Sequence, residues 1–223
     1  MSQDAVVTGA FRVLHICTGN ICRSPLAERL TRTGLEQRLG ADADRFVVES
    51  AGTWGHSGSP MEPHAVSTLA AYGVDGADFR ARELVAEHVV GADLVLGATR
   101  DHRAAAVVLH PRAASRTFTL REFARLAAAV EPGALTATDP VERGRELVRA
   151  AAARRGLVPP ETPRDDDLAD PYQGPEHAFA VCAQLVQHSL QRPLDLIAAA
   201  VESGPSPTRT ARTERHRHDV LGT

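Results

Sequence analysis

A cysteine and an arginine enclose a short loop near the start of the chain. Residues 17–23 read Cys-Thr-Gly-Asn-Ile-Cys-Arg. A loop of this kind can turn its backbone N–H groups toward one centre and bind a phosphate-sized dianion there. Arg23 can add a bidentate contact to two oxygens of that anion, and the same positive field favours the thiolate form of Cys17. These residue types indicate attack by Cys17 on the phosphorus of a phosphate ester, with a phosphocysteine intermediate.

The residues around this loop fit a strand, a tight turn and a helix. An apolar run at residues 11–16 precedes the loop and predicts a buried strand. Gly19 permits a positive φ, and Asn20 is among the few other residues that tolerate one. Ser24 suits the N-cap of a helix, and Pro25 suits its first position. We therefore expect the loop to join the end of a strand to the start of a helix.

Strand-like and helical patterns alternate along the rest of the chain, which predicts parallel βαβ units and an α/β fold. In such sheets ligands bind at the carboxyl ends of the strands. The further strand-like runs are 46–49, 94–97 and 116–119, and the helical patterns are 25–39, 63–72, 100–109, 120–129 and 175–201.

Five segments resemble the low-molecular-weight protein tyrosine phosphatases. The resemblance spans about residues 11–201. The segments are residues 13–28 around the loop, Ser50-Ala-Gly-Thr at 50–53, Arg-Ala-Arg at 80–82, Ala-Asp-Leu-Val-Leu at 92–96 and Asp-Pro-Tyr at 170–172. The resemblance implies a four-stranded parallel sheet flanked by helices, with the phosphate-binding loop between the first strand and the first helix. It also implies a phosphoric monoester hydrolase acting on phosphotyrosine without a metal or cofactor.

The resemblance assigns roles to individual residues. Cys17 is the expected nucleophile, and Arg23 holds the equatorial oxygens of the phosphoryl group. Asp170 is the expected general acid for the leaving phenolate and the base for water in the second step. Ser24 can also hydrogen-bond the Cys17 sulfur. The backbone N–H groups of the loop supply the remaining charge stabilisation, which makes phosphate ligands of Thr18, Gly19, Asn20, Ile21, Cys22 and Ser24.

The mouth of the site and its support depart from the family pattern in places. Tyr172 is expected to stack on an aromatic substrate ring, whereas Gln173 stands where the family often has a second tyrosine. Trp54 or His56 is expected to face the substrate. Asn20 and Ser50 are expected to support the loop through hydrogen bonds. Phe79 occupies the place of a histidine that completes this network in relatives, so the network is either reduced or completed by another group.

Cys22 suggests redox control. In the resembling family this cysteine is close to the nucleophile, so oxidised Cys17 can be trapped as a reversible Cys17–Cys22 disulfide. The alternative is that Cys22 only packs beneath the loop.

Composition limits the surroundings of the protein. The net charge is −3 and gives no reason to expect nucleic-acid binding. Three cysteines do not make a disulfide framework, and no secretory signal or membrane-length apolar run is evident. We expect a cytoplasmic monomer or weak dimer whose partner is a phosphotyrosine protein, with a tyrosine kinase among the candidates.

The chain divides into a flexible N-terminus at residues 1–10, a phosphatase-like domain at 11–201 and a disordered tail at 202–223. An insertion at about 130–169 contains several prolines, an acidic run at 165–167 and a helical pattern at 141–155. It is either a lid or docking element beside the site or, as we favour, a solvated surface loop. A pair of histidines in the tail, His216 and His218, is most simply solvated.

Three alternative functions remain open. A phosphoarginine phosphatase shares the chemistry, but the resembling enzymes have threonine at the position of Ile21. A thioredoxin-coupled arsenate reductase shares Cys-Thr-Gly-Asn but needs two further cysteines, and none lies between Cys22 and Cys182. A phosphate-binding module without turnover is less favoured, because nucleophile, arginine and acid are all present.

Overall fold

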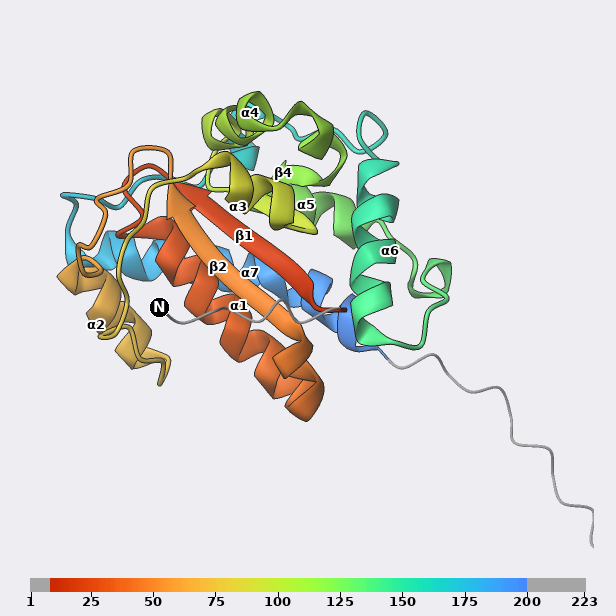
Figure 1. Cartoon of the computed structure of the whole chain (residues 1–223), viewed down its shortest axis with the longest axis horizontal. Helices are drawn as coiled ribbons and strands as arrows, with labels where there is room; N and C mark the ends of the chain where they lie inside the picture. The colour runs from red at the N-terminus through yellow and green to blue at the C-terminus, as the bar shows by residue number, and fades with distance from the viewer. Residues whose placement is uncertain (1–8, 200–223) are drawn as a thin grey trace, which may run out of the picture.

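Four parallel strands form the centre of the computed structural model, which describes residues 9–199 (Figure 1). Their order across the sheet is β2-β1-β3-β4, so β1 lies inside and its loop is flanked on both sides. The expected four-stranded parallel sheet is confirmed. The strands are β1 (Phe11–Cys17), β2 (Phe46–Gly52), β3 (Leu94–Gly97) and β4 (Thr117–Thr119).

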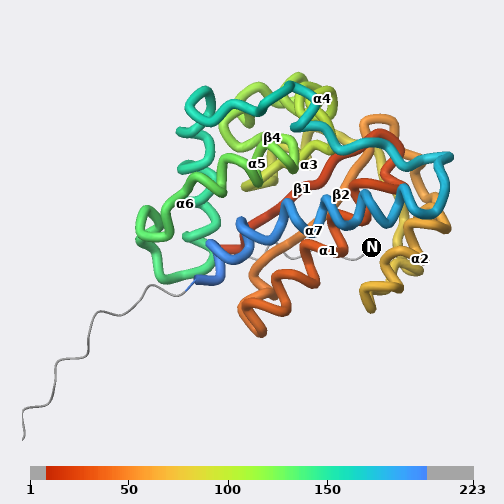
Figure 2. The backbone as a smooth tube through the Cα atoms, turned by 180° about the vertical axis from the view of Figure 1, so that it is seen from behind, coloured from red at the N-terminus to blue at the C-terminus, as the bar shows by residue number. Residues whose placement is uncertain are grey.

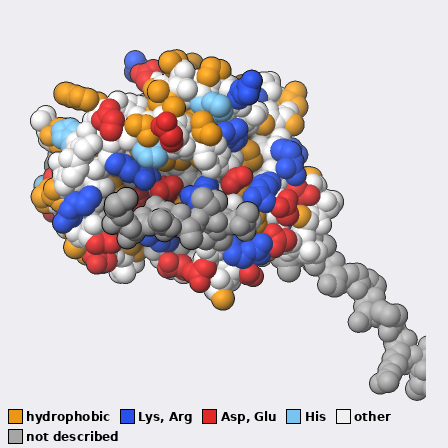
Figure 3. Space-filling view, in the orientation of Figure 1, with side chains coloured by type: hydrophobic (Ala, Val, Ile, Leu, Met, Phe, Trp, Pro, Cys, Tyr) orange, Lys and Arg blue, Asp and Glu red, His pale blue; other side chains and the backbone are white. Residues whose placement is uncertain are grey.

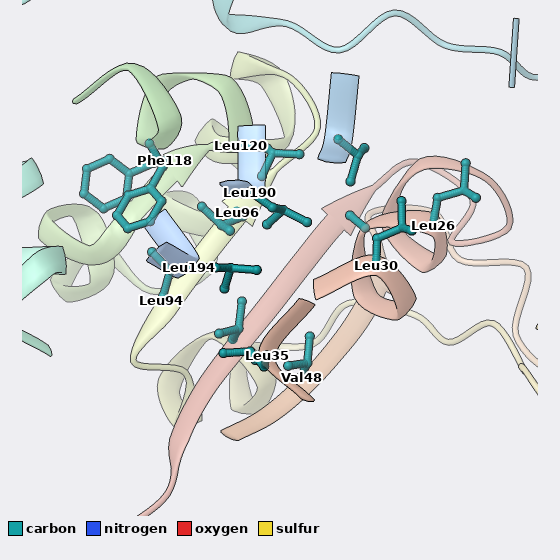
Figure 4. Packing of buried hydrophobic residues seen from close by; sticks show 14 of the residues in the cluster. Leu26, Leu30, Leu35, Val48, Leu94, Leu96, Phe118, Leu120, Leu190 and Leu194 are labelled. Atoms are coloured by element: carbon teal, nitrogen blue, oxygen red, sulfur yellow. The ribbon is translucent and has the colours of Figure 1, made fainter. Parts of the chain in front are cut away.

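Helices cover both faces of this sheet. Strand β1 is buried on both sides, as parallel strands are: Val13 and Cys17 belong to the larger apolar core, and Leu14 and Ile16 to the smaller one. In the larger core, leucines of α1 and α7 pack on the sheet (Figure 4), and α7 runs across it in Figure 2. The helices of the larger core are α1 (Arg23–Leu39), α2 (Pro63–Ala71), α5 (Leu120–Ala128), α6 (Pro140–Ala152) and α7 (Glu176–Ala198), and those of the smaller core are α3 (Ala86–Gly91) and α4 (Arg100–Leu109).

The insertion forms a packed helix and not the solvated loop that we favoured. Helix α6 stands beside the beginning of β1, at the opposite end of the strand from Cys17 (Figure 1). An added Cβ at Gly144 would lie 3.1 Å from the Phe11 ring, so the helix backbone closely approaches the sheet. The Arg143 side chain is 2% exposed and donates to the carbonyl of Leu196. Helix α6 is therefore not a lid, because it lies at the far end of β1 from the loop.

The segment that follows α6 covers the edge strand. The Arg155 guanidinium donates to the carbonyl oxygens of Thr117 in β4 and, at 2.7 Å, of Ala114. It also lies 4.0 Å from the centre of the Phe118 ring. Covering an edge strand in this way removes a surface that could otherwise pair with another chain. The insertion therefore completes the sheet on the side away from β2.

The predicted elements agree with the structure within a few residues, apart from α3 and four short 3-10 helices, which we did not expect. Of the expected flexible N-terminus at 1–10, residues 1–8 lie outside the described residues, whereas Ala10 is buried. The tail at 202–223 and its histidines His216 and His218 also lie outside them. Among residues 9–199, no helix combines the length and apolar character that a membrane span requires. Arginines and acidic side chains are intermingled over the face in Figure 3. The 3-10 helices are Gly40–Arg45, Pro111–Arg116, Pro132–Ala134 and Pro163–Asp166.

Candidate active site

The loop between β1 and α1 turns its carbonyl oxygens outward. The carbonyls of Cys17, Thr18 and Gly19 accept hydrogen bonds of 2.9 to 3.0 Å from backbone N–H groups of residues 53–56. The Ile21 carbonyl accepts a further one from the N–H of residue 62. Within the described residues, none of the N–H groups of 18–23 donates to a protein acceptor. These amides are therefore available to an anion, as the sequence predicted.

A strained asparagine holds the loop in this shape. Asn20 is fully buried and has φ of 56°, a conformation that costs energy for any residue other than glycine. Its side-chain amide donates to Ser24 Oγ at 2.9 Å and to Ser50 Oγ at 2.8 Å, and its oxygen accepts from the Arg82 N–H at 2.9 Å. The expected support by Asn20 and Ser50 is thus present as hydrogen bonds.

Glu28 completes this network. In relatives the completing residue is expected to be a histidine at the position of Phe79. The Ser50 hydroxyl donates to Glu28 Oε2 at 2.7 Å, and Arg32 lies 3.3 Å from the other oxygen. Burial raises the pKa of Glu28, partly offset by the Ser50 hydrogen bond and Arg32. Phe79 itself lies in the apolar core. The network therefore ends at a buried carboxylate that we did not assign to it.

Ser24 does not cap the helix. Helix α1 begins at Arg23 with Cys22 as its N-cap, so Ser24 lies within the first turn. Its hydroxyl lies 2.9 Å from the Cys17 sulfur and accepts the Asn20 amide hydrogen. Since the oxygen accepts from Asn20, its own hydrogen can point at the sulfur. The prediction that Ser24 is the N-cap was wrong. The predicted contact between Ser24 and the Cys17 sulfur is present.

Arg23 is hydrogen-bonded through its two terminal nitrogens and is unpaired at Nε among the described residues. Its NH1 donates to the Leu168 carbonyl at 3.2 Å, and its NH2 donates to Asp170 Oδ2 at 2.5 Å and to Thr18 Oγ at 3.3 Å. Its Nε is buried and has no partner among the described residues. Together, Nε and NH2 form the fork that binds two oxygens of a phosphoryl group. Asp170 occupies half of this fork in the free protein.

Three contacts just before Asp170 place it over the loop. Asp166 pairs with Arg125 at 2.8 Å, and Asp167 pairs with Arg100 at 2.9 Å. The Leu168 N–H donates to a β3–α4 loop carbonyl, that of residue 98, at 2.8 Å. The insertion therefore leaves the position of Asp170 intact. The structure brings Cys17, Arg23 and Asp170 into one site, although their catalytic roles remain predictions.

Aromatic side chains stand open around the mouth. Trp54 is 74% exposed and Tyr172 47% exposed, so neither is used in packing the core. The His56 ring lies beside Gly19, where an added Cβ would meet it at 3.1 Å. Ile21 is partly buried against the larger core. Trp54, His56 and Tyr172 thus lie where they are open to a ligand, and their contact with a substrate stays a prediction.

Cys22 is buried beside the loop. Burial is the main cause that raises its pKa well above the usual range, and the neighbouring Cys17 and Asp170 add to it. Cys17, Cys22 and Cys182 are all free thiols. Burial likewise raises the pKa of Cys182 to about 12, and this thiol lies in the larger apolar core. A Cys17–Cys22 disulfide stays a prediction.

His102 is a site residue that we missed. It lies in the first turn of α4 with 7% of its surface exposed, and its Nε2 is 3.0 Å from Thr18 Oγ. A signal was available: the carboxyl ends of parallel strands meet at one edge, so a histidine just after β3 lies near the loop that follows β1.

Comparisons with known proteins place the chain in a family. Residues 12–154, more than half of the chain, match the low molecular weight phosphotyrosine protein phosphatase family. A low molecular weight protein-tyrosine-phosphatase of Streptomyces coelicolor is 32% identical over 179 residues, which are 79% of this chain and 87% of that protein. A protein-arginine-phosphatase of Geobacillus stearothermophilus is 37% identical over 113 residues, which are 51% of this chain and 71% of that protein.

Solved structures extend the likeness beyond residue 154. The low molecular weight protein tyrosine phosphatase from T. tengcongensis has a TM-score of 0.59 and 28% identity, and the match covers 82% of this chain and 97% of that one. The YwlE arginine phosphatase from Geobacillus stearothermophilus has a TM-score of 0.59 and 26% identity over 83% of this chain and 91% of that one. The chain belongs to the low molecular weight phosphotyrosine protein phosphatase family.

Proposed function

We propose that this protein hydrolyses phosphotyrosine in proteins through a phosphocysteine formed on Cys17. The observation that carries the proposal is the contact between Asp170 and Arg23 at 2.5 Å, above a loop whose amides are unpaired among the described residues. That contact puts an acid, an anion-binding fork and a thiol in one place. Each of the three contributes to the cleavage of an aryl phosphate by this route.

In the first step the Cys17 sulfur attacks phosphorus. The S–P bond forms as the bond to the phenolic oxygen breaks, and Asp170 gives its proton to that oxygen. In the second step Asp170 takes a proton from water, whose oxygen attacks phosphorus and displaces the sulfur. The hydroxyl of Ser24, 2.9 Å from the sulfur, stabilises the thiolate that leaves.

The preference for tyrosine rests on the mouth of the site. Trp54 and Tyr172 are exposed and can flank a phenyl ring. Ile21 presents an apolar side chain in the same loop. A guanidinium group can also stack on aromatic rings, so the preference for tyrosine rests mainly on the apolar Ile21. The 37% identity to a protein-arginine-phosphatase nevertheless makes phosphoarginine a second candidate.

The first experiment is hydrolysis of p-nitrophenyl phosphate in the presence of a chelator. We expect turnover by the full chain and none by Cys17→Ser. Comparable activity in the two proteins would refute the mechanism.

A second experiment separates the two substrates. Rates on matched phosphotyrosine and phosphoarginine peptides are compared for the wild type, Ile21→Val and Ile21→Thr. Valine and threonine have the same shape, so only the hydroxyl differs between the variants. We expect phosphotyrosine to be preferred by the wild type and by Ile21→Val, with the preference reduced in Ile21→Thr. A wild type that prefers phosphoarginine would refute the assignment to tyrosine and leave the chemistry in place.

A further inference from the structure

The hydrogen bonds around His102 define its tautomer. The Thr99 backbone N–H donates to His102 Nδ1 at 3.2 Å, so Nδ1 carries a lone pair. The Thr99 hydroxyl approaches the same nitrogen at 2.7 Å. Burial, followed by the charge of Arg23, lowers the pKa of His102 to about 4, so the ring is neutral near pH 7. The one ring hydrogen therefore lies on Nε2 and is donated to Thr18 Oγ.

The Thr18 hydroxyl is thereby oriented. Its oxygen accepts from His102 Nε2 at 3.0 Å and from Arg23 NH2 at 3.3 Å. A hydroxyl oxygen has two lone pairs, and both are now used. Its hydrogen has no acceptor among the described residues, and the Thr18 side chain is exposed at the mouth. The hydroxyl is thus a donor that points away from both the histidine and the arginine.

This donor stands next to the position of the phosphoryl group. Thr18 directly follows the nucleophile, and its oxygen touches the same Arg23 nitrogen that Asp170 contacts. A phosphoryl oxygen that takes the place of the Asp170 carboxylate on this nitrogen comes beside the Thr18 hydroxyl. Hydrogen bonds to a charged acceptor are among the stronger ones in proteins.

We propose that the Thr18 side chain is a further phosphate-binding group and that His102 is the positioning residue that turns its hydroxyl hydrogen toward the bound phosphoryl oxygen. The inference rests on the proposed function and deepens it. It adds a side-chain donor to the backbone amides and Arg23, and it gives a role to a residue of α4 that touches no reacting atom.

Two substitutions of His102 separate positioning from structural support. Asparagine places its polar atoms near the position of Nδ1, so His102→Asn can keep the contact with the Thr99 N–H while it loses the donor to Thr18. Glutamine reaches the position of Nε2, so His102→Gln can keep the donor and lose the Thr99 contact. Thr18→Val removes the hydroxyl at nearly constant shape.

The readouts are the affinity of the full chain for inorganic phosphate by calorimetry, kcat and KM on p-nitrophenyl phosphate, and Tm. We expect Thr18→Val to weaken phosphate binding and to lower kcat/KM by about tenfold or more, the size typical of a hydrogen bond to a charged group. His102→Asn should show a smaller loss of the same kind with little change in Tm. His102→Gln should restore most of the affinity although its Tm falls.

The double variant Thr18→Val/His102→Asn completes the test. If His102 acts through Thr18, the double variant should bind phosphate no more weakly than Thr18→Val alone. Additive losses, or an affinity that follows Tm so that His102→Gln is the weaker binder, would overturn the inference while the proposed function stands. A wild type that neither binds phosphate nor hydrolyses the aryl phosphate would refute the proposed function, and this inference with it.

Discussion

Replacing Asp170 by asparagine should slow turnover and tighten phosphate binding at the same time. In the free protein the carboxylate takes half of the Arg23 fork, at 2.5 Å from NH2. A phosphate ion must displace it before both Nε and NH2 can bind. Asparagine has nearly the same size but no charge, so the fork becomes easier to open. The same change removes the group proposed to protonate the leaving oxygen.

The size of the binding effect follows from exposure. The Arg23 side chain is 5% exposed but that of Asp170 is 47% exposed, so water screens the pair considerably. Such a pair contributes about 1 kcal/mol, and its loss from the free state should tighten phosphate binding about fivefold. Repulsion between the carboxylate and the bound dianion acts in the same direction. Turnover should fall by roughly 10²–10⁴, as for a lost general acid.

Calorimetric titration with inorganic phosphate and the kcat for p-nitrophenyl phosphate measure the two effects. Asp101→Asn is the matched control, because it removes one exposed carboxylate at the start of α4 that makes no ion pair among the described residues. The control should change neither quantity appreciably. An Asp170→Asn protein that binds phosphate no better than the control would show that the carboxylate does not compete for Arg23, and our account of the free site would be wrong.

Three further predictions concern stability. Burial lowers the pKa of His15 to about 3, so its contribution to stability is complete above pH 6.5 and is lost as pH falls toward 3. The free energy of unfolding should drop by a few kcal/mol over that range. The drop should be smaller in His15→Gln and the same as in the wild type in the exposed control His188→Gln. Gly144→Val should cost on the order of 1–3 kcal/mol in denaturant unfolding because its side chain would meet Phe11, and an altered kcat/KM would contradict the separation of α6 from the site. Gln173 has φ of 60°, so Gln173→Val should be about 1–2 kcal/mol less stable than Gln173→Gly by the same assay, and equal stabilities would show that the turn carries no strain.

The loop chemistry could be predicted because it is local. Seven successive residues specify a strand end, a turn and a helix start, and Asn20 supplies the positive φ that the turn requires. Contacts between distant segments could not be predicted in this way. Glu28 joins Ser50, 22 residues away, and His102 joins Thr18, 84 residues away. The spacing of these residues carries no signal until the order of the strands is known.

The error at Ser24 has a similar origin. Ser-Pro before an apolar pattern is a good N-terminal signal, but two neighbours compete for the hydroxyl of Ser24. Asn20 donates to it and Cys17 lies 2.9 Å away. The helix begins two residues earlier than expected, at Arg23. Because its hydroxyl contacts the nucleophile, Ser24 does not cap the helix. The hydrogen bonds of the site therefore outweigh the local preference of Ser24 for the N-cap position.

The insertion was misjudged because composition describes solvation and not position. Its prolines and acidic run suggested a mobile loop, but its helix packs at the amino end of β1, which at seven residues separates it from Cys17 by roughly 20 Å. The cost of closing a longer connection grows only slowly with its length. Contacts at Asp166, Asp167 and Leu168 then fix the chain again just before Asp170. Because these anchors lie at the end of the insertion, the position of the acid depends on them and not on the length of chain that precedes them.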